Sequence, residues 1–253
     1  MTYLLSKPSS ALISEAKIPG DKSISHRAIM FGAIAKGQTR IEGILEGDDV
    51  LATLSAFELM GVVVDRPCAG VVIIEGVGKY GLSEPGRPLD LGNSGTSMRL
   101  LSGLLAGQRF DTVLTGDESL KSRPMGRVIE PLSKMGADIE SQDNRAPLII
   151  SGCSELQGIK YVLPVASAQV KSAVMLAGLY ASGETLIVEP VASRDHTERM
   201  LDAFSRKSSR GSKALRISGD AELVGQAVRV PSDISSAAFF IVAACLLSGS
   251  ELV

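Results

Sequence analysis

Apolar residues gather in four segments that recur at a spacing of about 70 residues along the chain. Each segment ends in a glycine, and the four span 28–37, 98–107, 170–183 and 237–249. Because they are apolar on almost every side rather than along one stripe, we predict helices that are buried all round. A repeat of this length is long enough to hold a whole supersecondary unit.

Shorter patterns between these segments predict the rest of that unit. β-branched or apolar runs that predict strands follow three of the glycines, at 39–44, 112–115 and 185–188. Amphipathic helices with apolar residues at i, i+4 and i+7 come next, at 50–57, 128–135 and 197–204. Hairpin-like pairs close two units, at 62–64 with 71–74 and at 137–141 with 148–150. Strand-like runs precede three of the buried helices, at 89–91, 161–165 and 227–230.

The repeat therefore predicts an α/β fold built from βαβαββ units. We expect a first domain of three units within 19–231, at about 19–76, 86–152 and 158–231, and the start of a fourth unit at Pro231. One fully buried helix per unit indicates pseudo-threefold symmetry, with helices inside and sheets outside. In that arrangement the N-terminal ends of the buried helices point the same way, and their free N–H groups favour anions.

The start of the first buried helix carries the residue types that bind anions. It reads Pro-Gly-Asp-Lys-Ser-Ile-Ser-His-Arg over 19–27. We expect Ser23 or Ser25 to be the N-cap, which places the free N–H groups beside Lys22, Ser23 and Arg27. The alternative is an ordinary capped helix with two solvated cations.

The other helix starts offer similar groups at corresponding positions of the repeat. The second helix begins at Asn93 to Gly95. The third begins at Ser167 and Gln169, with Lys171 nearby. The loops before the amphipathic helices add Arg123 and Arg194. Taken singly, these residues are also typical of turns, caps and solvated surface positions. Their agreement in register favours a shared anion site.

Composition narrows the remaining function classes. A net charge of -2 over 253 residues and few aromatic residues give no general attraction to nucleic acid or to a membrane. The three cysteines, Cys68, Cys153 and Cys245, are far apart and there are two histidines, so neither a disulfide framework nor a zinc site is indicated. We expect a reducing cytoplasm.

Several longer motifs together resemble one known family. They lie at 19–27, 91–96, 116–117, 123–126, 166–173 and 193–198. These motifs are similar to those of enolpyruvylshikimate-phosphate synthases of the shikimate pathway, and most similar to the bacterial class that includes glyphosate-tolerant members. The resemblance implies an inverse α/β barrel fold. It also implies transfer of the enolpyruvyl group of phosphoenolpyruvate to the 5-hydroxyl of shikimate 3-phosphate, with release of phosphate and without a metal or cofactor.

The resemblance also implies roles for single residues. Those implied to hold shikimate 3-phosphate are Lys22, Ser23, Arg27, Ser167, Gln169 and Arg194. Those implied to face phosphoenolpyruvate are Lys22, Gly95, Arg123 and Gln169. Gly95 leaves room where an alanine side chain would intrude, so we expect a complete enzyme with this first domain to be sensitive to glyphosate.

Family members have a second, similar domain, and this chain matches mainly the first. The resemblance implies that 1–18 and 232–253 belong to that second domain, which also holds the main catalytic carboxylates. We therefore expect an incomplete chain that is inactive alone, with exposed apolar surface at 237–247 and a tendency to self-associate, although full-length members are expected to be monomers. No main acid or base is assigned, although Lys22 is expected to contribute to catalysis. The acidic residues near the helix starts are interpreted as caps and turn residues, namely Asp21, Asp48, Asp49 and Asp117.

Two other functions stay open. One is a non-catalytic module that holds shikimate 3-phosphate in half a cleft. The other is the related enolpyruvyl transferase that acts on UDP-N-acetylglucosamine, which the shikimate-type motif at 21–27 disfavours. A separate departure from the repeat is the basic stretch at 205–213, which has no apolar residue and predicts a loop in place of a strand.

Overall fold

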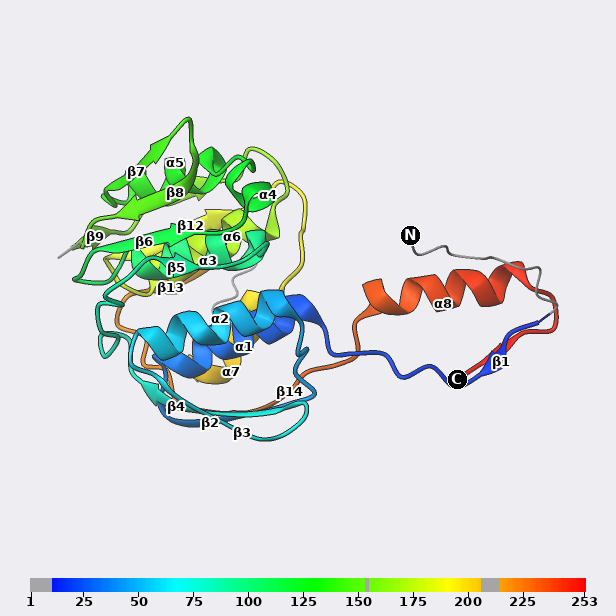
Figure 1. Cartoon of the computed structure of the whole chain (residues 1–253). Helices are drawn as coiled ribbons and strands as arrows, with labels where there is room; N and C mark the ends of the chain where they lie inside the picture. Colours follow the sequence, from blue (N-terminus) through cyan, green and yellow to red (C-terminus); the bar gives the residue numbers. More distant parts are fainter. Residues whose placement is uncertain (1–10, 153–154, 206–213) are drawn as a thin grey trace.

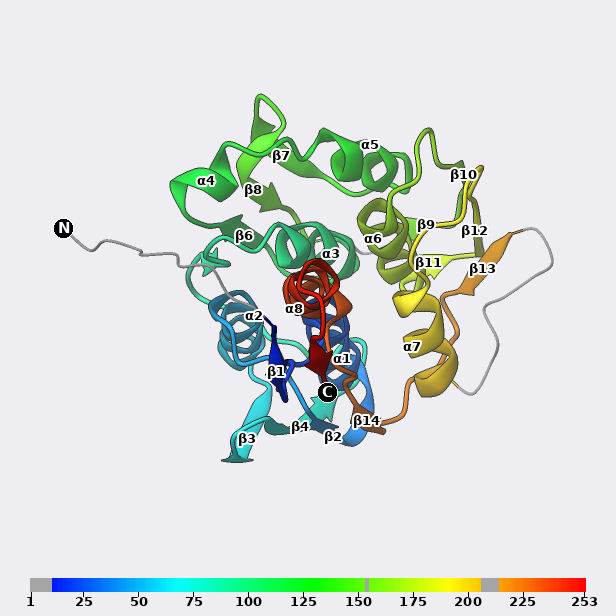
Figure 2. The same ribbon diagram turned by 90° about the vertical axis from the view of Figure 1, so that its right-hand side faces the viewer.

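The computed structural model describes residues 11–152, 155–205 and 214–253. Three sheets of three or four strands lie at the outside of a body whose middle is filled by helices, as Figures 1 and 2 show. The first unit comprises α1 (Lys22–Ile34), β2 (Lys36–Glu42), α2 (Asp48–Leu59), β3 (Val63–Cys68) and β4 (Val71–Val77). The second comprises β5 (Leu89–Asp90), α3 (Gly95–Leu105), β6 (Thr112–Thr115), α4 (Glu118–Lys121), α5 (Gly126–Lys134), β7 (Ile139–Gln142) and β8 (Arg145–Ile150).

The third unit is arranged in the same way. It comprises β9 (Leu156–Gln157), β10 (Lys160–Val162), α6 (Ala168–Gly178), β11 (Ala181–Ser182), β12 (Glu184–Val188), α7 (His196–Ser205) and β13 (Leu215–Ser218). In its main sheet, β10 pairs with β12 in parallel and β13 pairs with β12 antiparallel. The predicted loop at 205–213 lies, apart from Ser205 at the end of α7, outside the described residues.

The helices α1, α3 and α6 are the predicted buried helices, and the core residues of all three units pack around them. The N-cap of α1 is Asp21, whose side chain accepts a hydrogen bond of 2.8 Å from the backbone N–H of Ile24. The prediction of Ser23 or Ser25 as the cap was wrong, because the helix begins two to four residues earlier. The helices also end before their glycines: Gly37, for example, has a φ of +84° and is the second residue of β2.

The strand β14 (Ala227–Arg229) pairs in parallel with β2, so that the sheet order is β14-β2-β4-β3. The second sheet has the same pattern, β5-β6-β8-β7, with β5 parallel to β6. The run at 227–230, which we counted with the third unit, therefore completes the sheet of the first. This pairing brings the end of the third unit back beside the first, while the sheets of the three units remain separate.

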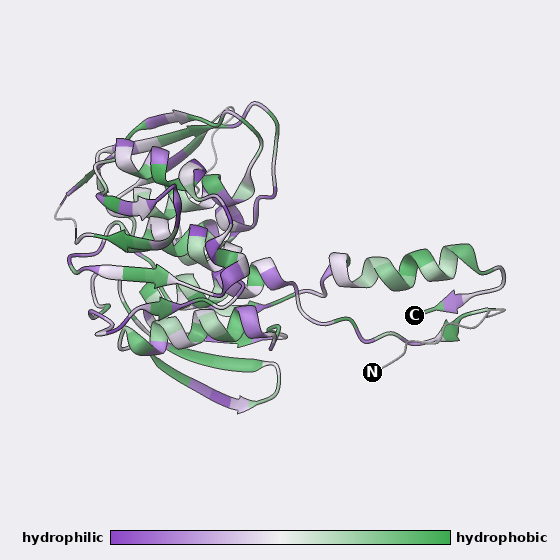
Figure 3. Ribbon diagram, turned by 45° about the horizontal axis from the view of Figure 1, so that its top comes forward, coloured by the Kyte–Doolittle hydropathy of each residue, from purple (hydrophilic) through white to green (hydrophobic). Residues whose placement is uncertain are grey.

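The helix α8 (Ile234–Leu246) stands away from the body, on the side where α1 begins (Figure 1). None of its residues is buried: Phe239 is 80% exposed and Leu246 is 78% exposed. The ribbon of α8 is predominantly hydrophobic (Figure 3), as expected for 237–247. Beside it, β1 (Ile13–Ser14) pairs in parallel with β15 (Glu251–Leu252). Within the described residues, every helix is too short or too polar to cross a lipid bilayer.

Candidate anion-binding site

The N-terminal ends of α1, α3 and α6 meet at one end of the body, which we call the helix-start face. His26 of α1 lies 3.4 Å from the Ser94 hydroxyl at the start of α3. The side-chain amide of Gln169, on α6, donates to the Thr96 hydroxyl of α3 at 3.1 Å. Arg27 of α1 donates to Ser172 of α6 at 2.8 Å. These contacts join all three helices, so the predicted convergence of their N-terminal ends is present.

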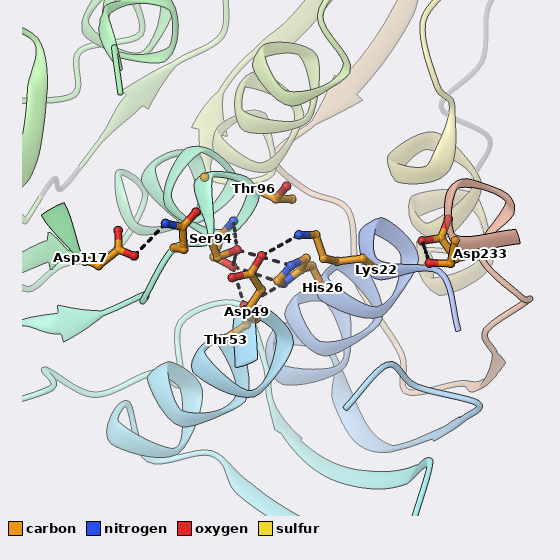
Figure 4. A network of polar contacts seen from close by, with 12 residues as sticks. Lys22, His26, Asp49, Thr53, Ser94, Thr96, Asp117 and Asp233 are labelled. Atoms are coloured by element: carbon orange, nitrogen blue, oxygen red, sulfur yellow. Dashed lines mark hydrogen bonds and ion pairs between the residues drawn. The ribbon is translucent and has the colours of Figure 1, made fainter. Parts of the chain in front are cut away.

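Lys22 is the first residue of α1 and is the most exposed cation of that helix start, with 47% of its side chain accessible. Its Nζ lies 2.6 Å from Oδ2 of Asp49, in the first turn of α2 (Figure 4). Asp49 is not a cap, since Gly47 holds the N-cap position of α2 without a side-chain bond. The ion pair fixes the direction of the lysine while leaving it open to solvent.

Arg27 lies deeper, with 4% of the residue exposed. Its Nε donates to the Thr197 hydroxyl at 2.6 Å, and one terminal nitrogen donates to the backbone carbonyl of Ser23 at 2.9 Å. With the bond to Ser172, three of the five guanidinium N–H groups are used, all on neutral acceptors. Among the described residues, no carboxylate oxygen lies within ion-pair distance of Arg27. Burial lowers its pKa to about 10, and the attraction of Glu198 and Asp21 only partly offsets this.

Behind Lys22, a ring of buried polar side chains ties α1, α2 and α3 together (Figure 4). The His26 Nδ1 is 2.8 Å from the Thr53 hydroxyl, which is 2.6 Å from that of Ser97. The Ser97 hydroxyl is 2.7 Å from that of Ser94, which returns to His26 Nε2. Burial lowers the pKa of His26 to about 3, and a neutral imidazole can close this ring with one donor and one acceptor nitrogen.

The start of α3 brings two guanidinium groups together over a glycine. Arg99 donates to the Gln169 side chain at 3.0 Å and to the Gly95 carbonyl at 3.2 Å. Arg123 donates to the side chain of Asn93, whose amide donates to Asp117 at 2.7 Å. A Cβ at Gly95 would lie 2.9 Å and 3.0 Å from terminal nitrogens of these two arginines. Burial lowers the pKa of Arg99, and the positive charge of Arg123 lowers it further.

Two of the acidic residues near the helix starts are caps, as interpreted from the sequence. Asp21 caps α1, and Asp117 caps α4 by accepting a hydrogen bond of 2.7 Å from the Leu120 N–H. Asp48 lies in the first turn of α2, where a carboxylate is favourable to the helix dipole.

At the start of α6, the N-cap is Ser167, which accepts from the Val170 N–H at 3.4 Å. Arg194 is exposed, and its charge is among those that lower the pKa of Arg27, which places it in electrostatic range of that guanidinium. The placement of Lys171 at the anion site was wrong. It is fully buried and pairs with Glu189 at 2.8 Å and with Glu198 at 2.6 Å.

Apart from Lys171, the predicted site residues therefore lie at the starts of α1, α3 and α6 or in the loops beside them, and the sequence reasoning missed one cation. Arg99 lies between Gly95 and Gln169, and its only sequence signal was its position one turn after Gly95. In the part of the chain that the structure describes, no group of His, Cys, Asp and Glu side chains is arranged to hold a metal ion. The face offers cations, amides, hydroxyls and helix N-termini, a set of groups that suits phosphate and carboxylate ligands.

Comparison with known proteins agrees with this chemistry. A family model described as EPSP synthase (3-phosphoshikimate 1-carboxyvinyltransferase) matches residues 6–253. A 3-phosphoshikimate 1-carboxyvinyltransferase from Alkalilimnicola ehrlichii is 59% identical over 247 residues, which are 97% of this chain and 55% of that relative. One from Legionella pneumophila is 55% identical over 253 residues, 100% of this chain and 58% of the relative.

Solved structures are similar as well. An EPSP synthase from Acinetobacter baumannii superposes with a TM-score of 0.88 at 53% identity, over 96% of this chain and 55% of that one. A second structure of EPSP synthase from the same organism gives a TM-score of 0.87. The expected α/β fold is thereby confirmed, and the chain spans a little over half the length of the relatives it matches. The chain belongs to the EPSP synthase family.

Proposed function

We propose that this chain forms the shikimate 3-phosphate-binding half of an enzyme that transfers the enolpyruvyl group of phosphoenolpyruvate to the 5-hydroxyl of shikimate 3-phosphate. The relatives' name, 3-phosphoshikimate 1-carboxyvinyltransferase, supplies the reaction. The observation that carries the proposal is the environment of Arg27. Its guanidinium is buried, and among the described residues two of its N–H groups have no acceptor and its charge has no carboxylate partner. A phosphate group would satisfy both the charge and the fork of donors.

The neighbouring groups extend this site to a second anion. In the proposal, shikimate 3-phosphate is held by Lys22, Ser23, Arg27, Ser167, Gln169 and Arg194. Phosphoenolpyruvate lies against Lys22, Gly95, Arg123 and Gln169, to which we add Arg99 because it contacts both Gly95 and Gln169. Both substrates carry several negative charges, so their close approach requires a dense set of cations and amide donors.

The chemistry of the proposed transfer needs positioning and charge stabilisation. The 5-hydroxyl gives up its proton as its oxygen attacks the central carbon of phosphoenolpyruvate, and the methylene carbon takes a proton, which gives a tetrahedral ketal. Loss of phosphate, together with a proton from the new methyl group, restores the double bond. The residues of this chain bind and orient the two anions and offset their charge. We assign no main acid or base, because Asp21 and Asp117 are engaged as caps and Asp49 is paired with Lys22.

A calorimetric titration of the 253-residue chain with shikimate 3-phosphate tests the proposal. We expect saturable binding that Lys22→Ala weakens about tenfold, the size expected for loss of one charge-assisted contact. Lys134→Ala is the matched control, since it removes an exposed lysine from an i,i+4 pair with Glu130 on α5. Absence of binding in a protein whose circular dichroism shows it to be folded would refute a preformed half-site.

A non-catalytic binding module remains the second candidate, because the chain spans a little over half the length of its relatives. Release of phosphate from phosphoenolpyruvate in the presence of shikimate 3-phosphate distinguishes the two when this chain is joined to the remaining part of one of its relatives. Turnover by the joined protein supports the half of a transferase, and binding without turnover supports a module. The exposed apolar face of α8 leads us to propose further that this chain self-associates. Sedimentation velocity over a range of protein concentrations tests that part separately.

A further inference from the structure

A buried cluster of charges lies beneath the start of α6. Lys171 is at its centre, and its Nζ contacts Oε2 of Glu189 and Oε1 of Glu198. The side chains of Lys171 and Glu198 are 1% and 4% exposed, and that of Glu189 is 16% exposed. Glu189 also accepts a hydrogen bond of 2.5 Å from the Ser193 hydroxyl, in the loop that carries Arg194. Burying three charges is costly even when they are paired, so the cluster calls for a role beyond packing.

The cluster borders Arg27. Thr197, which accepts from the Arg27 Nε, immediately precedes Glu198. Glu198 is the carboxylate whose charge attracts Arg27 most strongly, and its second oxygen, Oε2, is buried without a hydrogen-bond partner in the described part of the chain. Arg27, which has two N–H groups without an acceptor among the described residues, is therefore attracted by Glu198, whose Oε2 has no hydrogen-bond donor there. The two do not form an ion pair, since Glu198 is already held by Lys171.

We propose that Lys171 is a positioning residue that occupies Glu198 and Glu189 and so keeps Arg27 available to the phosphate group of a ligand. The inference rests on the proposed function, in which Arg27 binds shikimate 3-phosphate. Lys171 contacts both glutamates, whereas Arg27 contacts neither and donates to neutral acceptors. Without Lys171, Glu198 loses its ion-pair partner while its charge still attracts Arg27, so this internal carboxylate then competes with the ligand.

Lys171→Met in the full chain tests this competition. If Arg27 then spends about nine-tenths of its time on Glu198, the apparent affinity for shikimate 3-phosphate falls about tenfold, because only the remaining fraction can bind. The double variant Lys171→Met/Glu198→Gln lacks the competing charge and is expected to recover most of that loss. Lys134→Met is the matched control for loss of a paired lysine and is expected to leave the affinity unchanged.

Glu198→Gln alone separates this role from a purely structural one. A glutamine at 198 can still accept from Lys171 but no longer attracts Arg27 by charge. We expect this variant to bind shikimate 3-phosphate at least as tightly as the parent. If the cluster only holds α6 and α7 together, Glu198→Gln weakens binding and the double variant is no better than Lys171→Met; either result overturns the inference. The single variant also decides the matter if Lys171→Met does not fold.

The Nε–H resonance of Arg27 gives a readout that does not depend on binding. We expect Lys171→Met to shift this resonance and the double variant to return it toward the parent position. If the parent chain binds no shikimate 3-phosphate, the proposed function fails while this resonance still tests the contact. A resonance that stays in place in Lys171→Met refutes the recruitment of Arg27 by Glu198. If the parent binds and Arg27 moves as expected without any loss of affinity, the positioning role of Lys171 is wrong and the proposed function stands.

Discussion

Replacing His26 by asparagine removes the one titratable group from the hydrogen-bonded ring that joins α1, α2 and α3. The imidazole is fully buried, and its shortest contact is the 2.8 Å bond between Nδ1 and the Thr53 hydroxyl. An asparagine amide can reproduce that bond, because its polar atoms occupy nearly the position of Nδ1. It does not reach Ser94, so we expect a loss of about 1–2 kcal/mol in the free energy of unfolding at neutral pH.

The larger effect is on the pH dependence of stability. Burial, reinforced by the charges of Lys22 and Arg27 and opposed by Asp49, lowers the pKa of His26 from 6.5 to about 3 in the folded chain. Below the unfolded pKa, the unfolded chain takes up a proton that the folded chain does not, so stability falls as the pH falls from 6.5 toward 3. The slope is about 1.4 kcal/mol per pH unit, which gives about 2 kcal/mol lost at about pH 5 relative to about pH 7.5.

Urea unfolding followed by circular dichroism, on the parent and on His26→Asn at about pH 7.5 and about pH 5, measures this term. The parent is expected to lose about 2 kcal/mol more than the variant between the two conditions. His196, whose pKa is also lowered by burial, is present in both proteins, so its contribution cancels. An equal loss of stability in the two proteins would refute the assignment of a buried, neutral His26.

Three further predictions concern other parts of the chain. Gly95→Ala places a Cβ within 3.0 Å of terminal nitrogens of Arg99 and Arg123. In an enzyme that includes this chain, we therefore expect a raised KM for phosphoenolpyruvate and weaker inhibition by glyphosate. Equal inhibition curves with and without the change would contradict the steric argument. Lys79→Met removes an ammonium that donates to two backbone carbonyls, and we expect a loss of about 1–3 kcal/mol in urea unfolding. Phe239→Ser removes a large apolar side chain from the exposed face of α8, so sedimentation velocity is expected to show less self-association than for the parent.

Local patterns predicted the helices and most strands because their signals lie within a few residues. The apolar residues of α3 and the following turn identify a buried helix from sequence alone, and the i, i+4, i+7 stripe of α5 identifies its amphipathic neighbour. The N-cap of α1 was harder, since Asp21, Ser23 and Ser25 are all capping residues within one turn. Which of them caps the helix depends on where the incoming chain is held, and the hydrogen bond from the Asp21 N–H to the Pro231 carbonyl holds it from the far end of the sequence.

Partners in the sheets were less predictable than the strands themselves. The run at 227–230 is recognisably a strand, yet its place beside β2 is set by contact across most of the chain, with Ala227 opposite Arg40. Sequence order favoured the third unit, because neighbours in the chain are often neighbours in the sheet. The packing of the three units places the end of the third beside the first, and β14 supplies the parallel strand that β5 and β10 supply in the other two sheets.

The same limit applies to the helix-start face, and it explains why one lysine was misplaced. A motif shows that Lys171 lies one turn into α6, close to Gln169, and a lysine there is a reasonable anion ligand. The motif does not show that Glu198 of α7 forms an ion pair with this lysine, because only the packing of the third unit brings Lys171 and Glu198 together. Arg27 of α1, by contrast, donates to two hydroxyl groups of the third unit, those of Thr197 and Ser172, and to no carboxylate there. The residue types at the site follow from the sequence, whereas the choice of which cation is neutralised inside the protein and which is left for a ligand follows from the contacts among the three helices.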